Sequence, residues 1–544
     1  MVKRTIQTIT SKISGLGEAA FWLSLFGLFS QILALFRDRL LAHNFGAAAE
    51  LDVYYAAFKI PDLAFVTVAS LVSISALVPL FAKKETEGER HLKDATDSIF
   101  TVFSVLIIVF CVALFFLMPA IIKLSFPGFS PGIQAQTIFL SRILLFSPLL
   151  LGFSNFFGSI VQYEKRFILY SFSPLLYNIG IIAGIALFNN ALGITSAVIG
   201  VVFGALLHLL LQAVFVMRSH LRPRWTISIK WIDVLETAKI SIPRTFALSI
   251  ASFVGFFFVI LASFMETGSI AIFNFSWNLQ SAPLSLIGVS FSLAAFPALA
   301  VSAAKNHIGE VIERMSSGIR QIIFWSLPFS ALLIVLRAHI VRVVLGSGSF
   351  DWAATRLVAA SLAVFVISAV FQSLTLFLSR SHYALGKTKW PLVGNIFGGV
   401  FSVLIAIFFI KYFDDFNLIF NFLADFLNIS DLSSKILLLP LAYSIGSAVS
   451  ALILFLALGR KLALEIFRLV RRTVLNSSLI ALSSGVGSYF ALSFSDHLFN
   501  LETFLGVLGH GFLAGIVGIA CGAAVLYFVA KKDLTDLIYY EKKH

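Results

Sequence analysis

Long apolar runs are the feature that most constrains this chain. The sequence of 544 residues holds fourteen of them, each near the ~20 residues that an α-helix needs to cross a bilayer core. A soluble enzyme is excluded, because 59% of the residues are hydrophobic and only 12% are charged. The sequence therefore predicts an all-α polytopic membrane protein with 14 transmembrane helices, at residues 19–35, 53–81, 99–122, 138–161, 167–188, 192–217, 240–264, 270–301, 321–345, 357–379, 391–410, 436–458, 474–494 and 504–530.

The basic residues predict the orientation of these spans. Thirty of the 40 Lys and Arg residues fall in the N-terminal segment, in alternate connections and in the C-terminal tail, and Lys and Arg favour cytoplasmic segments. The longest loop of the opposite set, 411–435, is acidic instead. We therefore expect both termini in the cytoplasm. One outer loop departs from this pattern, because it carries Arg337, Arg342 and Arg356.

An internal repeat predicts two related halves. Residues 174–179 read PLLYNI and residues 391–396 read PLVGNI, an offset of 217, while Pro79 and Pro297 lie at an offset of 218. The offset covers six spans, an even number, so both copies run in the same direction. We expect two pseudo-symmetric six-helix lobes at residues 1–218 and 219–460, followed by two additional helices and a cytoplasmic tail at 461–544.

Ionisable residues inside spans mark candidate functional positions, because each costs about 2.5–3.5 kcal/mol at a helix centre on insertion scales. The densest set lies around the first outer loop and comprises Arg37, Asp38, Arg39, His43, Asp52, Lys59 and Asp62, with Pro61 expected to break the second helix. A solvated loop is the favoured interpretation for Arg39, His43 and Asp62. For Arg37, Asp38 and Asp52 we favour a polar cavity wall with an ion pair across the loop.

Other chemistry finds little support in the sequence. We find no cluster of His, Cys, Asp or Glu at metal or catalytic spacing and no Gly-x4-Gly-Lys nucleotide motif. We therefore expect no metal, no cofactor and no enzymatic activity. The net charge of +13 is interpreted as attraction to anionic lipid headgroups, so nucleic acid is not an expected partner.

Short motifs occur in one order along almost the whole chain. They are Phe36-Arg37-Asp38, Phe45-Gly46, Asp52, Ala57-Phe58-Lys59-Ile60-Pro61, Val78-Pro79, Pro127-Gly128-Phe129, Arg166-Phe167 and Tyr383-Ala384-Leu385. In this order and spacing the chain resembles the MurJ/MviN family of lipid II flippases. The resemblance implies the fold of the multidrug/oligosaccharidyl-lipid/polysaccharide exporter superfamily, a bacterial inner membrane location and transfer of undecaprenyl-pyrophosphate-linked peptidoglycan precursor to the outer leaflet. A lipid-linked anionic substrate and membrane lipids are the implied partners, and cell-wall synthesis proteins are further candidates.

The resemblance also assigns site residues and shows departures. It places Arg37, Asp38 and Asp52 at a cavity and its outer gate, and it includes Lys59 in a family motif. This chain has Gln31 and Asn278 at two positions where the family typically has arginines. An anionic headgroup is then expected to rely on Arg37 and Lys59 as cations and on Gln31 and Asn278 as neutral donors.

Three alternatives to lipid II transfer remain open at this point. The missing arginines favour a flippase for another polyprenyl-linked glycan, or a drug or cation antiporter of the same superfamily. A non-transporting membrane scaffold with this fold is the alternative from a different class.

Overall fold

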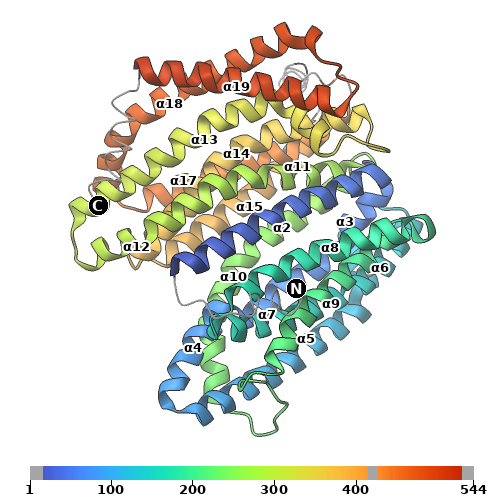
Figure 1. Cartoon of the computed structure of the whole chain (residues 1–544), viewed down its shortest axis with the longest axis vertical. Coiled ribbons are helices and arrows are strands. Elements are labelled where there is room, and N and C mark those ends of the chain that lie inside the picture. Colours follow the sequence, from blue (N-terminus) through green and yellow to red (C-terminus); the bar gives the residue numbers. More distant parts are fainter. Residues whose placement is uncertain (1–15, 414–424, 426, 428, 430–431, 530–544) are drawn as a thin grey trace, which may run out of the picture. The chain divides into compact units, whose positions relative to one another are not determined.

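The computed structural model describes residues 16–413, 425, 427, 429 and 432–529 (Figure 1). These residues form two compact units, unit 1 ending at Ile270 and unit 2 beginning at Ala271. This division by packing falls later in the chain than the lobe boundary expected near residue 218, because the helix that follows that boundary packs within unit 1. Both termini and most of the acidic 411–435 loop lie outside the described residues.

Unit 1 consists of helices and short irregular helical turns. Its elements are α2 (Leu16–Phe45), α3 (Ala49–Ala64), the π-helix η1 (Phe65–Ala69), the 3-10 turn η2 (Ser70–Val72), α4 (Ile74–Glu87), α5 (Glu89–Ser125), α6 (Pro131–Leu144), α7 (Phe146–Tyr163), α8 (Phe167–Leu192), α9 (Thr195–Val216) and α10 (Trp231–Ala262). Aromatic side chains from α4, α5 and α7 dominate one core, including Phe81, Phe100 and Phe156.

Unit 2 is also helical throughout its described part. Its elements are α11 (Ser269–Pro283), which begins at the boundary, the π-helix η3 (Leu284–Val289), α12 (Ser290–Ala304), α13 (Ile308–Val344), α14 (Trp352–Ala384), α15 (Lys389–Lys411), the 3-10 turn η5 (Leu432–Leu437), α17 (Leu438–Leu456), α18 (Arg460–Ser495), the 3-10 turn η6 (Asp496–Leu498) and α19 (Phe504–Val529). The last two long helices pack against α13 and each other (Figure 1). The expected C-terminal appendage is therefore part of unit 2.

Twelve helical segments of the described chain are long and apolar enough to cross a membrane. Two of the fourteen expected spans fall short of this measure. The 53–81 run is divided among α3, η1, η2 and α4, and the apolar part described for the 240–264 run is the 14-residue stretch Ser249–Ala262. The protein is a multi-pass all-α membrane protein, and the count of 14 stays a prediction.

In the described residues each unit contains one π-helical segment, and each of the two lies in the second apolar run of a lobe expected from the sequence. The segment in unit 1 begins at Phe65 and that in unit 2 at Leu284, 219 residues later, close to the offset of the sequence repeat. Pro61 lies inside α3 and the regular helix continues to Ala64, so the expected break begins one turn later than Pro61. A π-segment replaces regular i→i−4 hydrogen bonds with longer ones and often marks a functional bend.

The two units also share a packing device. A Cβ added to Gly180 of α8 would lie 2.3 Å from the Cα of Gly204 in α9. A Cβ added to Gly398 of α15 would lie 2.6 Å from the Cβ of Ser450 in α17. Small residues allow helix backbones to approach closely in a membrane, where van der Waals packing drives association. Any larger residue at Gly180 would force these two helices apart.

Candidate functional site

The guanidinium of Arg37 and the carboxylate of Asp38 form an ion pair near the C-terminal end of α2. Arg37 Nη2 lies 2.7 Å from Asp38 Oδ1, and Arg37 Nε donates to the same oxygen at 3.0 Å. Asp38 is only 4% exposed. The adjacent carboxylate therefore occupies one edge of the guanidinium, and the ion pair expected across the loop with Asp52 stays a prediction.

Asn178 of α8 extends this ion pair into a network between helices. Arg37 Nη1 donates to Asn178 Oδ1 at 3.3 Å, and Asn178 Nδ2 donates to Ser30 Oγ of α2 at 3.2 Å. The sequence repeat indicates Asn178 as a hydrogen-bonding residue, and its contacts with α2 confirm this. What the sequence does not reveal is that Arg37 is its partner, since 141 residues separate the two.

Asp52 holds the chain that follows α10. Its Oδ2 accepts a hydrogen bond of 2.6 Å from the backbone N–H of Gly268, and Asp52 is 7% exposed. Gly268 has a φ of +92° and its Cα hydrogens face Ala47 O, where an added Cβ would lie at 2.2 Å. Only glycine fits this position. Asp52 thus positions a connection between two spans as well as lying near the start of α3.

The remaining expected site residues lie on α2, α3 and α11. Lys59 and Asp62 are close enough on α3 to interact electrostatically and are both half-buried. Gln31 is exposed on α2, one and a half turns before Arg37. Asn278 is half-buried on α11 and belongs to unit 2. The structure therefore brings Arg37 and Asp38 together, whereas a shared site with Asn278 stays a prediction.

A neutral polar cluster, which sequence reasoning missed, lies inside unit 2. Gln372 Nε2 of α14 donates to Gln280 Oε1 of α11 at 3.1 Å, and Tyr443 OH of α17 donates to Gln372 Oε1 at 3.2 Å. The rings of Trp277 and Tyr443 lie 4.7 Å apart, centroid to centroid. Amide and hydroxyl groups within apolar runs are the signal that could have found it, since such groups hydrogen-bond across membrane helices.

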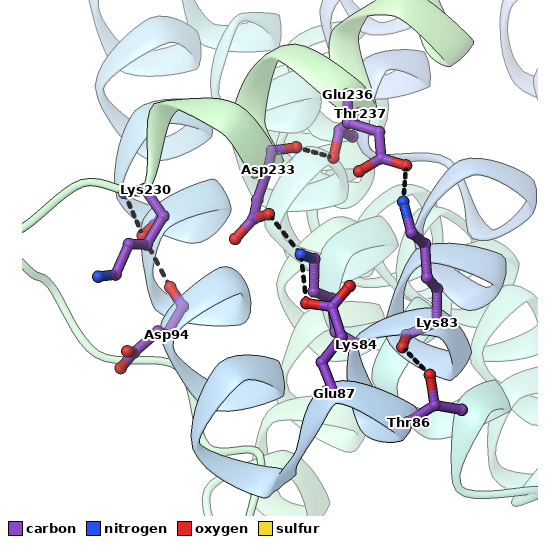
Figure 2. Close-up of polar contacts among 10 residues, drawn as sticks. Lys83, Lys84, Thr86, Glu87, Asp94, Lys230, Asp233, Glu236 and Thr237 are labelled. Carbon is purple, nitrogen blue, oxygen red and sulfur yellow. Dashed lines mark hydrogen bonds and ion pairs between the residues drawn. The ribbon is translucent and has the colours of Figure 1, made fainter.

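Ion pairs connect the end of α4 to the first turns of α10 (Figure 2). Lys84 Nζ lies 2.9 Å from Asp233 Oδ1, and their side chains are only 11% and 10% exposed. Lys84 also contacts Glu87 at 2.7 Å, and the more exposed Lys83 contacts Glu236 at 2.6 Å. The carboxylates of Glu87 and Asp233 raise the pKa of Lys84 because they stabilise its charged form. We call these five residues the α4–α10 ion-pair cluster.

The connection between α9 and α10 is held along α5 in the same region. Asp97 pairs with Lys93 and accepts a hydrogen bond from the backbone N–H of Arg224 at 2.8 Å. Ser98 Oγ accepts a hydrogen bond from the backbone N–H of Lys230 at 3.0 Å. These contacts and the α4–α10 ion-pair cluster explain why α10 packs within unit 1.

His208 and possible metal ligands were the remaining candidates for polar chemistry among the described residues. His208 Nδ1 lies 2.7 Å from Ser154 Oγ, so a neighbouring hydroxyl is the hydrogen-bond partner of this ring nitrogen. Among the described residues no group of three His, Cys, Asp or Glu side chains could hold a metal ion.

Comparisons with known proteins agree on one family. Residues 41–509 match the sequence model of the family described as lipid II flippase MurJ. A relative from Haemophilus influenzae, described as "Probable lipid II flippase MurJ", is 25% identical over 539 residues, which cover 93% of this chain and 98% of the relative.

Solved structures show the same fold. One titled "Lipid II flippase MurJ, inward closed conformation" superposes with a TM-score of 0.75 at 22% identity, over 94% of this chain and 99% of the other. A multidrug resistance MATE family transporter of the MOP superfamily, in an inward-facing conformation, gives a TM-score of 0.65 at 15% identity, over 83% of this chain and 99% of the other. At these identities the likeness concerns the fold alone, and it agrees with the architecture expected from the sequence.

Proposed function

The chain belongs to the lipid II flippase MurJ family, and from this premise we propose that it transfers lipid II from the inner to the outer leaflet of a bacterial inner membrane. The family is one of transporters, so the chain is assigned to transport rather than catalysis. Its substrate is then a lipid carrying a pyrophosphate, a disaccharide and a peptide. The proposal needs a cation that can meet the pyrophosphate inside the protein.

The observation that carries this proposal is the hydrogen bonding of the Arg37 guanidinium, which leaves part of the group available for a ligand. Its guanidinium makes three hydrogen bonds to described residues, two to Asp38 and one to Asn178, out of five N–H groups. Asp38 fixes one edge of the fork, so the unused N–H groups are held in a defined orientation. A guanidinium with free N–H groups binds phosphate oxygens through charge-assisted hydrogen bonds.

The movement that we propose is alternating access of the two units. The π-segments η1 and η3 begin 219 residues apart, one in each unit, and such segments often mark functional bends. The sequence contains no nucleotide-binding motif, so membrane potential is the proposed source of energy. An anion that moves outward across an inside-negative membrane gains about 2.3 kcal/mol per charge per 100 mV.

The prenyl tail of the substrate needs an apolar surface that continues into the lipid. On α18 and α19 large side chains are exposed, among them Leu475, Leu482, Phe490, Phe512 and Ile519. Exposed apolar side chains on membrane helices contact lipid acyl chains rather than water. We propose that the tail stays in the membrane beside these two helices while the headgroup passes through the protein.

The orientation belongs to the same proposal. Both termini are cytoplasmic, as the basic residues predict. A single cysteine at Asn421, which lies outside the described residues, should react with an impermeant reagent added to intact cells after Cys111 and Cys521 are replaced. Reaction only after permeabilisation would place this loop inside and reverse the orientation.

The decisive test is complementation of a strain depleted of its own lipid II flippase. Wild type and Arg39→Ala should sustain growth, whereas Arg37→Ala should not and should accumulate lipid II in the inner leaflet. Arg37→Lys keeps the charge but loses the planar fork, so it should support growth only partly. Equal growth with Arg37→Ala and wild type would contradict the assigned role of Arg37, and failure of wild type would contradict lipid II as the substrate.

A flippase for another polyprenyl-linked glycan is the second candidate function, because Gln31 and Asn278 replace arginines that the family typically carries. Neutral hydrogen bonds are roughly half as strong as charge-assisted ones, so lipid II should bind more weakly than to a family member with the full set. Gln31→Arg combined with Asn278→Arg should therefore tighten lipid II binding, measured by native mass spectrometry. Unchanged or weaker binding by the double variant favours the second candidate.

A further inference from the structure

A cavity of about 640 Å³ lies within unit 2, where α13 ends and α14 begins. Its volume is in the range of about 300–1,000 Å³ that is typical of sites for small ligands. The residues that give it its character are Arg337 of α13, Trp352 and Arg356 of α14, and Asp425, Leu427 and Ile429. All belong to one unit, and none of them belongs to the Arg37 network.

Arg337 is the unusual feature of this cavity. Its Nη1 donates to the carbonyl of Ile334 at 2.8 Å, and its Nη2 donates to the carbonyl of Leu427 at 3.4 Å. Both acceptors are neutral, and no carboxylate of the described residues lies within ion-pair distance of this half-buried guanidinium. Three of its five N–H groups therefore have no acceptor among the described residues.

The charge of a half-buried cation is normally balanced by a nearby anion. A half-buried charge loses part of its hydration, and carbonyl dipoles replace only some of it. In unit 1 the half-buried cations Arg37 and Lys84 lie beside carboxylates. An anion that enters the cavity would supply the missing partner to Arg337.

The other charges of the cavity give it a positive balance. Arg356 contributes a second guanidinium and Asp425 a carboxylate, so the described residues of the lining carry one net positive charge. Arg342 lies nearby with its guanidinium carbon 5.8 Å from the centre of the Trp352 ring. That contact holds the indole at the cavity and adds further positive potential.

We propose that this cavity is an anion-binding site, and that it takes a phosphate or phosphate ester held between the guanidinium groups of Arg337 and Arg356. The planar fork of arginine presents paired N–H groups that match phosphate oxygens. The anion is either free phosphate or the phosphate of a lipid headgroup. On the orientation predicted from the basic residues, the site faces the outer side. The proposal does not depend on which lipid the protein transports.

The first experiment measures binding of radiolabelled inorganic phosphate to the purified full-length protein in a zwitterionic detergent. We expect saturable binding by wild type and at least a tenfold weaker apparent affinity for Arg337→Gln and for Arg356→Gln. Arg460→Gln removes the same charge from an exposed position at the start of α18 and should bind like wild type. Arg337→Lys keeps the charge without the fork and should fall between wild type and Arg337→Gln.

A second experiment separates the two sources of phosphate. The same proteins are placed in nanodiscs of phosphatidylcholine with or without phosphatidylglycerol, and retained lipid is measured by native mass spectrometry. Retention of phosphatidylglycerol by wild type and its loss in Arg337→Gln identifies a lipid headgroup, whereas binding of inorganic phosphate alone identifies a free anion. Each variant must elute as a single folded species. Equal affinity of wild type and Arg337→Gln for both ligands, or binding of neither ligand by wild type, overturns the proposal.

Discussion

Two half-buried cations of unit 1, Arg37 and Lys84, and one of unit 2, Arg337, have different partners. In unit 1, Arg37 lies 2.7 Å from Asp38 and Lys84 lies 2.9 Å from Asp233. In unit 2, Arg337 donates only to backbone carbonyls among the described residues. Carboxylates therefore balance the charges of these two cations of unit 1, whereas Arg337 keeps three N–H groups without an acceptor among the described residues.

The partner of a cation determines how much its removal should cost in folding free energy. Removing one member of a buried ion pair leaves the other without compensation, which costs about 3–5 kcal/mol. A carbonyl that loses a donor is left with a smaller penalty, because it is neutral and has other partners in the helix. Loss of a charge at Arg37 or Lys84 should therefore affect folding, in addition to the transport role proposed for Arg37, whereas loss of the charge of Arg337 should mainly affect binding.

The largest effect is expected at the Arg37–Asp38 pair. Asp38→Asn leaves Arg37 buried without a counter-charge and should lower the free energy of unfolding by about 3–5 kcal/mol. Arg37→Gln together with Asp38→Asn removes both charges and should restore most of that stability. The thermal midpoint in detergent measures this, and complementation should fail for both variants. A double variant as unstable as Asp38→Asn would show that the pair does not act through charge balance.

The next largest effect is expected at the α4–α10 ion-pair cluster. Lys84→Met leaves Asp233 nearly buried and without its cation, a loss of about 1–3 kcal/mol. Adding Asp233→Leu should recover it, since an apolar pair can replace a buried ion pair. Lys83→Met is the matched control, because its partner contact is solvent-exposed and should be worth under ~1 kcal/mol. Similar midpoints for Lys83→Met and Lys84→Met would remove the distinction between the two lysines.

The apolar runs predict the helices well because membrane insertion depends on a local property, the hydropathy of about 20 successive residues. Partner choice is not local. Lys84 and Asp233 are 149 positions apart, and neighbouring acids such as Glu236 offer the same chemistry. Arg37, in contrast, pairs with the adjacent residue, Asp38. Which carboxylate pairs with a cation depends on packing that hydropathy does not encode.

The π-segments and the two arginines Arg337 and Arg342 also depend on packing that the sequence pattern does not predict. Pro61 indicates a break, but the irregular segment begins at Phe65, where the packing of α7 and α10 allows it. Arg337 and Arg342 oppose the orientation rule when counted as charges. In the structure one is satisfied in part by carbonyls and the other by the Trp352 ring, so no cytoplasmic location is needed to accommodate them.

Alkaline pH should reduce the stabilisation by the α4–α10 ion-pair cluster, and this effect should be smaller than that of Lys84→Met. The pKa of Lys84 is raised in the folded state, so its contribution to stability is complete below the ordinary lysine value and is lost as pH rises through the folded pKa. The difference in thermal midpoint between wild type and Lys84→Met should therefore be constant from pH 7 to about pH 10 and shrink above it. A difference that stays constant up to pH 11.5 would exclude an electrostatic origin. Arginine stays charged over this range, so an Arg337 variant should show no such trend.

The smallest effect on folding is expected at Arg337. Arg337→Met keeps much of the side-chain volume and removes two hydrogen bonds to carbonyls, one of them long, at 3.4 Å. Because the half-buried charge disappears with its desolvation cost, the net change in the free energy of unfolding should be under ~1 kcal/mol without phosphate. With saturating phosphate, wild type should gain stability by mass action and Arg337→Met should not. A loss in phosphate-free buffer as large as that of Lys84→Met would mean that Arg337 is a structural cation after all, and the contrast between the two units would then be one of partner chemistry alone.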